Sequence, residues 1–403
     1  MNFFGKKEVS TDSGKINELL TRGVERIYPA REALEARLKS GERLSLYYGI
    51  DPTGPTLHLG HAVNLLKLKQ FQELGHEVII LYGGFTAQIG DPTDKLSARQ
   101  PLTPAQIKKN TAQYRTLIGK ILDVRGTHLK FLDNEEWSNK LKPADFLKLV
   151  SLFTVSQLLE RDMFQERIKQ GKEIHGNEFL YPVFQAYDAV TMDVDIQLGG
   201  NDQTFNMLAG RTLMRKMKNK EKFVMVMKLL VDPTGKKMGK SEGNMVTLED
   251  SAEDMYGKIM SWPDGMILPG FELLTTVPLS SVVEIGQELS SGKNPRDLKA
   301  RLAREVVALY YGAKAGEKAE AEFTRAFRDK APTEFVDVVL RGRGVVEALM
   351  EKEIISSKSD LRRLIDEGAV SKLPEGEKVG VEFMERASAG EYRLGKHRFV
   401  RIR

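Results

Sequence analysis

The sequence predicts an α/β protein with a parallel sheet, followed by a helical domain and a small α+β unit. Apolar runs at 43–50 and 77–84 flank a helix-like periodic stretch at 59–74, which makes a strand–helix–strand unit. Such a unit joins parallel strands by a right-handed connection, and ligands bind at the carboxyl ends of those strands. Further apolar runs at 193–200 and 222–230 extend the pattern.

The composition is that of an ordinary globular protein. The 403 residues are 41% hydrophobic and 29% charged, which suits two or three domains with separate cores. The net charge of +5 permits a polyanionic partner without demonstrating one. The absence of cysteine excludes disulfides and thiolate zinc sites. We find no secretory signal and no apolar stretch near the ~20 residues of a membrane span, so we expect a cytoplasmic protein.

The first half of the chain is assigned in order from apolar periodicity and breaks. The first 30 or so residues have a polar, helical pattern, and the strand at 43–50 stops at Asp51-Pro52-Thr53-Gly54. A strand at 128–134 interrupts a mostly helical stretch, which predicts a helical insertion at about 100–175. The remaining expected elements are a helix at 177–190, a strand at 193–200, a helix at 202–217, a strand at 222–230 and a Gly/Lys-rich loop at 235–243.

The second half divides into two further units. Residues 246–330 have a helical pattern with breaks at 262–265 and 292–295, which predicts a helical domain. A boundary follows near Ala331-Pro332. Residues 331–403 contain a helix-turn-helix-like stretch at 344–370 and close in short strands, so we expect a compact third domain; the nucleotide-binding part is then 1–245.

The tetrapeptide His58-Leu59-Gly60-His61 lies where the first strand has ended and a helix begins. A helix N-terminus favours phosphate, glycine permits a close approach, and imidazoles can donate to phosphate oxygens. Histidines at an ordinary helix cap would look the same, so the motif alone is weak. A metal site is disfavoured, because the two histidines are three residues apart with no carboxylate beside them.

A second motif, Lys236-Lys237-Met238-Gly239-Lys240-Ser241, is flanked by glycines. Flexible glycines let lysines reach a phosphate chain and stabilise charge on a pyrophosphate leaving group, although a solvated basic loop has the same composition. With His58–His61 it resembles the HIGH and KMSKS signatures of class I aminoacyl-tRNA synthetases, which bracket a Rossmann-like fold. Gly239 stands where the family commonly has serine.

Four stretches narrow the resemblance to the bacterial-type tyrosyl-tRNA synthetases, which the chain resembles through residues 44–245. They are Tyr47–Thr53, Gly90–Thr93, Tyr181–Asp188 and Gly199–Gln203. The segment 202–211, DQTFNMLAGR, departs from the DQWGN form of many relatives and leaves open which groups near Thr204 and Phe205 shape the pocket. A tryptophanyl enzyme would lack the pair Tyr47 and Asp188. A catalytically inactive, synthetase-like RNA-binding protein is the other alternative.

The resemblance implies a role for each matching residue in tyrosine binding. Tyr47 and Asp188 would form hydrogen bonds to the phenol. Asp91, Tyr181 and Gln185 would hold the ammonium group, and Gln203 would orient the carboxylate. Tyr181, Gln185 and Asp188 are spaced i, i+4, i+7, so independently of the family they share one helix face. Such a stripe in an apolar helix requires a buried polar partner, which is a ligand or the protein backbone.

The resemblance also implies an ATP site, with ATP as a co-substrate carrying Mg²⁺, no tightly bound cofactor and no resident metal. The tyrosine carboxylate would attack the α-phosphorus without a side-chain nucleophile. Asp51, Thr53 and His58 would lie at the phosphates, and His61 and Asp202 would lie near the ribose. Gly60 and Gly200 would allow the nucleotide to approach closely. The pyrophosphate would be clamped by Lys95, Arg99, Lys237 and Lys240, and Ser241 belongs to the same loop as the last two.

The last unit resembles an S4-type RNA-binding domain, which implies tRNA(Tyr) as a partner. Lys358, Arg362 and Arg363 fall near one helix face, and the end of the chain adds Arg393, Lys396, Arg398, Arg401 and Arg403. A solvated face on a structural domain would have the same pattern. Apolar segments at 146–158 and 117–122 exceed what a helical insertion hides easily, and with the resemblance they predict a homodimer.

Overall fold

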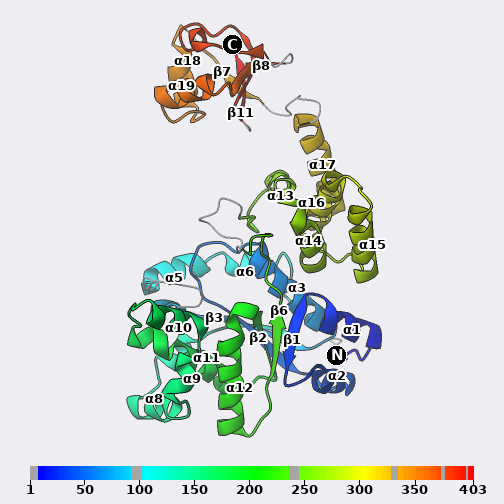
Figure 1. Cartoon of the computed structure of the whole chain (residues 1–403), viewed down its shortest axis with the longest axis vertical. Coiled ribbons are helices and arrows are strands. Elements are labelled where there is room, and N and C mark those ends of the chain that lie inside the picture. The colour runs from blue at the N-terminus through cyan, green and yellow to red at the C-terminus, as the bar shows by residue number, and fades with distance from the viewer. Residues whose placement is uncertain are drawn as a thin grey trace, which may run out of the picture. The chain divides into compact units, whose positions relative to one another are not determined.

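The computed structural model describes residues 8–91, 102–235, 245–327, 335–340, 342–373, 377–395 and 398–403 (Figure 1). Its contacts divide the chain into two compact units, Met1–Gly316 and Glu317–Arg403. Within the described ranges, no helix has both the length and the apolar character needed to cross a bilayer.

A six-stranded sheet organises the first unit, in the order β1-β6-β5-β2-β3-β4. Five strands run parallel and β1 is antiparallel to β6 at one edge. The expected strand–helix–strand unit is β2, α3 and β3. The strands are β1 (Val24–Tyr28), β2 (Ser45–Ile50), β3 (Glu77–Tyr82), β4 (Leu129–Asp133), β5 (Ile196–Gly200) and β6 (Phe223–Met227).

Strand β1 corrects the expectation that the first 30 residues are helical. Helix α1 (Ser13–Thr21) ends before it, and residues 24–28 pair with β6 instead. Only Ile27 of β1 is buried, because the strand lies at the sheet edge and turns most side chains to solvent. Such a strand has no apolar run, so periodicity does not reveal it.

Helices pack against the sheet and follow its strands. Helices α11 and α12 lie side by side and bury a core with Tyr47, Ile79 and Leu81 of the sheet (Figure 1). The helices of this part are α2 (Arg31–Lys39), α3 (Leu59–Glu73), α4 (Thr86–Ile89), α5 (Pro104–Thr111), α6 (Tyr114–Ile118), α7 (Glu135–Ser138), α8 (Pro143–Val150), α9 (Val155–Leu159), α10 (Asp162–Lys169), α11 (Gly176–Met192), η1 (Asn201–Gln203) and α12 (Thr204–Lys218).

The segment 100–175, expected as an insertion, contributes β4 to the main sheet as a parallel neighbour of β3. The apolar residues at 117–122 are not a surface patch: Leu117, Ile118, Ile121 and Leu122 are all buried within their own unit. This part of the interface expectation is wrong, because apolar composition alone does not distinguish a core segment from an exposed one. In 146–158, by contrast, Leu147 and Val155 are 67% and 65% exposed.

Helices follow the sheet, as the pattern predicts, and all of them but the last lie wholly within the first unit. They are α13 (Ala252–Met260), η3 (Asp264–Met266), α14 (Ile267–Leu274), α15 (Leu279–Ser290), α16 (Pro295–Tyr311) and α17 (Ala313–Phe327). Ser251 and Asn294 cap α13 and α16, where each side chain accepts a backbone N–H of the first turn. Arg22 is buried and donates to four backbone carbonyls at 271–277, which ties the N-terminal segment to α14.

The second unit contains the part of α17 from residue 317 onward, a five-stranded sheet in the order β7-β11-β10-β8-β9 and two further α-helices in its described residues. Its core is apolar and includes Leu349, Leu361, Val370 and Val400. The elements are β7 (Val336–Val338), α18 (Val345–Glu351), α19 (Lys358–Asp366), β8 (Val370–Lys372), β9 (Glu377–Lys378), η4 (Val381–Met384), β10 (Gly390–Leu394) and β11 (Arg398–Ile402). The helix-turn-helix-like stretch thus forms α18 and α19.

Candidate active site

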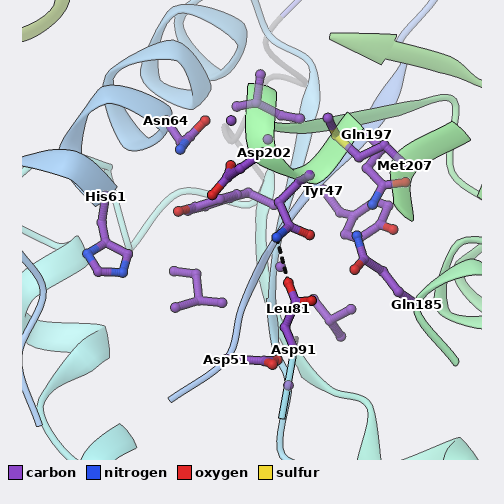
Figure 2. Close-up of a pocket in the computed structure, with 18 of the residues that line it drawn as sticks. Tyr47, Asp51, His61, Asn64, Leu81, Asp91, Gln185, Gln197, Asp202 and Met207 are labelled. Atoms are coloured by element: carbon purple, nitrogen blue, oxygen red, sulfur yellow. Dashed lines mark hydrogen bonds between the residues drawn. The ribbon is translucent and has the colours of Figure 1, made fainter. Parts of the chain in front are cut away.

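A cavity of about 340 Å³ opens at the carboxyl ends of the parallel strands, where the strand order predicts a ligand site (Figure 2). Residues from β2, β5 and the turns after β3 and β6 line it. Every predicted tyrosine and ATP residue that the structure describes is among them, namely Tyr47, Asp51, Thr53, His58, Gly60, His61, Asp91, Tyr181, Gln185, Asp188, Gly200, Asp202 and Gln203. The remaining five, Lys95, Arg99, Lys237, Lys240 and Ser241, lie outside the described residues.

The two histidines form the N-terminal cap of α3. The Nδ1 atom of His58 accepts from the Gly60 N–H at 3.1 Å, and Nδ1 of His61 accepts from the His58 N–H at 3.2 Å. Burial lowers the pKa of His58 to about 4 and that of His61 well below its ordinary value. Both rings are therefore neutral at pH 7, with the proton on Nε2, so each offers one N–H donor to a ligand.

The segment that follows the Gly/Lys-rich loop pairs with this histidine motif. Residues 246–248 follow that loop directly and pair with residues 57–59. The bonds are Leu59 N–H to the Val246 carbonyl at 3.0 Å and Leu248 N–H to the Leu57 carbonyl at 2.8 Å. The segment that follows the second motif thus pairs with the histidine motif, although the two are far apart in the sequence.

The other end of the cavity contains Asp188 and Tyr47. Asp188 is 2% exposed and accepts from Nε1 of Trp137 at 2.8 Å and Nδ2 of Asn134 at 3.2 Å. Burial raises its pKa to about 7, and the two donors oppose that rise. The buried hydroxyl of Tyr47 has no hydrogen-bond partner in the described part of the chain. A hydroxyl group on a ligand would satisfy both side chains.

A second carboxylate, Asp51, is held by two hydroxyl donors. Tyr181 donates to Oδ2 and Thr86 to Oδ1, each at 2.8 Å. Gly83 must be glycine here, because a Cβ would lie 1.9 Å from Oδ1 of Asp51. The buried ring of Tyr181 thus links α11 to the loop after β2, and its own pKa is raised well above the ordinary value by burial and then by Asp51.

Asp91 is the third carboxylate and lies in a buried ion pair. Nη2 of Arg161 lies 3.3 Å from its Oδ1, and Nε2 of Gln203 donates to its Oδ2 at 2.6 Å. Oε1 of Gln203 accepts in turn from Asn206 at 2.9 Å. Together, Asp51, Asp91 and Asp188 give this end of the cavity several carboxylates, which favours a ligand with an ammonium group.

Several lining or supporting residues were not predicted from the sequence. Asn134 and Trp137 follow β4 directly, and the rule that ligands lie at the carboxyl ends of parallel strands would have indicated them had β4 been placed in the sheet. Arg161 and Gln197 have no local signal, because their partners are distant in the chain. The other unpredicted lining residues include Tyr48, Asn64, Thr86 and Lys228.

The three predicted RNA-binding residues, Lys358, Arg362 and Arg363, are in the second unit. All three are exposed on α19, and Nη2 of Arg363 also lies 2.9 Å from Oδ1 of Asp360. Of the basic residues expected near the chain end, Arg401 pairs with Glu391 at 2.8 Å. Lys396 lies outside the described residues.

Known structures share this fold. A C-terminally truncated mitochondrial tyrosyl-tRNA synthetase from Aspergillus nidulans superimposes with a TM-score of 0.65 at 23% identity, over 78% of this chain and 94% of that one. Tyrosyl-tRNA synthetase from Archaeoglobus fulgidus, solved with L-tyrosine, gives a TM-score of 0.59 at 22% identity. The match covers 76% of this chain and 99% of that one.

Sequence comparison extends over almost the whole chain. Residues 39–328 match the family "tRNA synthetases class I (W and Y)". The tyrosine–tRNA ligase of Carboxydothermus hydrogenoformans is 42% identical over 401 residues, 96% of this chain and 97% of that protein. That of Haemophilus influenzae is 38% identical over 397 residues, 98% of both. The chain therefore belongs to the bacterial-type tyrosyl-tRNA synthetases of class I.

Proposed function

We propose that the cavity activates L-tyrosine with ATP and passes the tyrosyl group from the adenylate to the 3′ end of tRNA(Tyr). The observation that carries this proposal is the pair formed by Asp188 and the unbonded hydroxyl of Tyr47. A phenol between them donates to the carboxylate and accepts from the hydroxyl. Phenylalanine leaves both polar groups buried without that partner, which disfavours its binding.

The rest of the amino acid fits the carboxylates beyond this pair. Asp91 and Gln185 bind its ammonium group, and Tyr181 supports them by fixing the neighbouring Asp51. Gln203, which is held against Asp91, orients the carboxylate of the amino acid. These contacts place the reacting oxygen towards the histidine end of the cavity, where positioning lowers the entropic part of the barrier.

ATP occupies the histidine end as its Mg²⁺ complex, and the metal ion is part of the substrate. His58 and His61 donate from Nε2 to oxygen atoms of the nucleotide, Thr53 lies at the phosphates, and Asp202 accepts from the ribose. A Cβ at Gly200 would lie 2.7 Å from Oδ1 of Asp202, so a side chain at this position would collide with the carboxylate assigned to the ribose.

In the activation step, a tyrosine carboxylate oxygen forms a bond to the α-phosphorus while the bond from that phosphorus to the bridging oxygen breaks. Pyrophosphate leaves with the electron pair. Charge grows on the leaving group, and in this proposal the cations that stabilise it are Lys95, Arg99, Lys237 and Lys240; Ser241 follows Lys240 in the sequence. The chain supplies position and electrostatic stabilisation rather than a covalent intermediate.

The domain assignment follows from this function. Residues 1–245 form the Rossmann-like catalytic domain, with a dimer interface in the helical segment at about 100–175; residues 246–330 form a helical domain; and residues 331–403 form an S4-like RNA-binding domain. The exposed basic residues of α19 contact tRNA phosphates in this proposal. In this proposal the protein acts as a homodimer in the cytoplasm, where tRNA and ATP are present.

Amino-acid-dependent exchange of pyrophosphate into ATP tests the function. Tyrosine should support exchange, and the other nineteen amino acids should be far weaker. In Asp188→Asn, the preference for tyrosine over phenylalanine should fall by about tenfold or more, because the ionised acceptor is lost. Exchange driven equally by another amino acid, or an unchanged preference in the variant, would contradict the assignment.

A further inference from the structure

Lys222 is fully buried behind the amino-acid end of the cavity. Its Nζ donates to Oε1 of Gln197 on β5 and to the backbone carbonyl of Met207 on α12, the latter at 3.2 Å. It also lies 5.9 Å from the centroid of the Tyr47 ring. Gln197, Met207 and Tyr47 all line the cavity (Figure 2). Lys222 is not itself a lining residue but contacts all three.

The surroundings of Lys222 suit a neutral amine. Burial, followed by repulsion from Arg211, lowers the pKa of Lys222 well below its ordinary value. No carboxylate of the described residues forms an ion pair with it. A neutral amine has two N–H donors, and the two oxygen acceptors use both. Burying a polar amine at this depth carries a desolvation cost that its two hydrogen bonds only offset, so stability alone does not explain the contact.

Helix α12 leaves space for this amine at Gly210. A Cβ at that position would lie 2.6 Å from Nζ of Lys222 and 3.2 Å from Oε1 of Gln197. Glycine inside a helix is less favourable than alanine. Its presence here is explained by the space that the contact between Lys222 and Gln197 requires. Two elements distant in the sequence are thus adapted to the same contact.

We propose that Lys222 is a positioning residue for amino-acid recognition, acting through the Gln197 amide and the Tyr47 ring. Because Oε1 of Gln197 accepts from Lys222, the amide is turned with its Nε2 donors away from the lysine. No described residue accepts from this Nε2, so an oxygen atom of the bound amino acid is the acceptor that fits. Tyr47 is the direct neighbour of Gln197 in the β2–β5 register.

This inference rests on the proposed function of the cavity, and tyrosine-dependent exchange by the unchanged enzyme tests that function separately. The variant Lys222→Met keeps a side chain of similar length without the donor. We expect its KM for tyrosine to rise about tenfold, while kcat and the KM for ATP change little, because the lost contact affects binding of the amino acid alone.

Lys67→Met is the matched control. Lys67 is also a buried lysine, 3% exposed, and its Nζ donates to the Leu19 carbonyl at 2.6 Å. Neither residue lines the cavity. Burial lowers its pKa to about 7. This control should lose thermal stability with an unchanged KM for tyrosine. Equal KM values for tyrosine in the two variants would overturn the proposal.

Gly210→Ala keeps the proposal testable if Lys222→Met does not fold. The added methyl group displaces Nζ of Lys222 without changing either polar side chain, so the KM for tyrosine should again rise. In Gln197→Ala, which removes the amide, adding Gly210→Ala should have no further effect on this KM. Fully additive effects of the two changes, or an unchanged KM in Gly210→Ala, would show that Lys222 does not act through Gln197.

Discussion

Trp137 donates its indole N–H to Oδ1 of Asp188 at 2.8 Å, and this bond joins α7 to the C-terminal half of α11. Asn134 donates to the other oxygen of the same carboxylate at 3.2 Å. Both donors favour the ionised form, whereas burial favours the protonated form and brings the pKa of Asp188 to about 7. The acceptor for the phenol is therefore close to its titration point at neutral pH.

The first prediction is that Trp137→Phe raises the pKa of Asp188 further and weakens tyrosine binding. Removal of one hydrogen bond to a charged group costs roughly 1.5–3 kcal/mol, which is about tenfold or more in KM at neutral pH. As the pH is lowered from about 9 to 6, Asp188 becomes protonated and the KM for tyrosine should increase. This increase should begin at a higher pH in the variant than in the wild type. Trp262→Phe, outside the cavity lining, is the control. Identical pH profiles for all three proteins would refute the role of Trp137.

The second prediction concerns stability without ligands. The folded pKa of Asp188, about 7, lies above the ordinary value of 3.8, so the native state binds this proton more tightly than the unfolded state. The resulting stabilisation is complete below about pH 4 and is lost as the pH rises through about 7. Urea unfolding should show the stability of the wild type falling between about pH 5 and 8 more steeply than that of Asp188→Asn. Parallel curves would contradict the raised pKa.

The third prediction compares two buried ion pairs, one at the cavity and one outside its lining, by the effect of tyrosine on thermal stability. In Arg161→Met, the buried carboxylate of Asp91 loses the guanidinium of Arg161 as its partner. The free energy of unfolding should therefore fall by about 3 kcal/mol or more. Bound tyrosine then supplies a cation, so the rise in Tm with tyrosine should be larger than in the wild type. Arg167→Met is the matched control, because Arg167 pairs with Glu178 outside the cavity lining at 3.0 Å. Equal tyrosine-dependent shifts in both variants would argue against ammonium binding at Asp91.

The fourth prediction tests the RNA-binding face. Changing Lys358, Arg362 and Arg363 together to glutamate should raise the KM for tRNA by about tenfold or more and leave pyrophosphate exchange unchanged. The control changes three exposed basic residues elsewhere in the unit, Lys352, Lys378 and Arg386, to glutamate. Similar losses of charging activity in both triple variants would indicate a general charge effect rather than a contact of α19.

The fifth prediction concerns the homodimer. Leu147 and Val155 are the exposed apolar residues of segment 146–158, so Leu147→Asp with Val155→Asp should convert a particle of about twice 45.3 kDa into one of 45.3 kDa in light scattering. Val283→Asp, at a residue 62% exposed on α15, should leave the mass unchanged. A wild-type mass of 45.3 kDa at micromolar concentration would exclude the dimer.

Local patterns were sufficient for much of the fold. Continuous apolar runs indicated β2 and β3, and apolar periodicity from about Leu59 indicated the start of α3. Chain order and the carboxyl-end rule then placed the cavity, because parallel strands bring those ends to one edge. The spacing of Tyr181, Gln185 and Asp188 correctly predicted that they share one helix face, and all three line the cavity. This prediction was possible because helix periodicity is a local property of the sequence.

Tertiary structure alone decided which side chains support these residues. Trp137 and Asp188 are 51 residues apart, Arg161 and Asp91 are 70 apart, and Lys222 and Gln197 are 25 apart. Strand β1 likewise depends on its partner β6, and the burial of Leu117 and Leu122 depends on what packs over them. Such contacts join segments through the packing of the whole unit, and the period of a local sequence carries no information about a partner that chain folding brings from elsewhere.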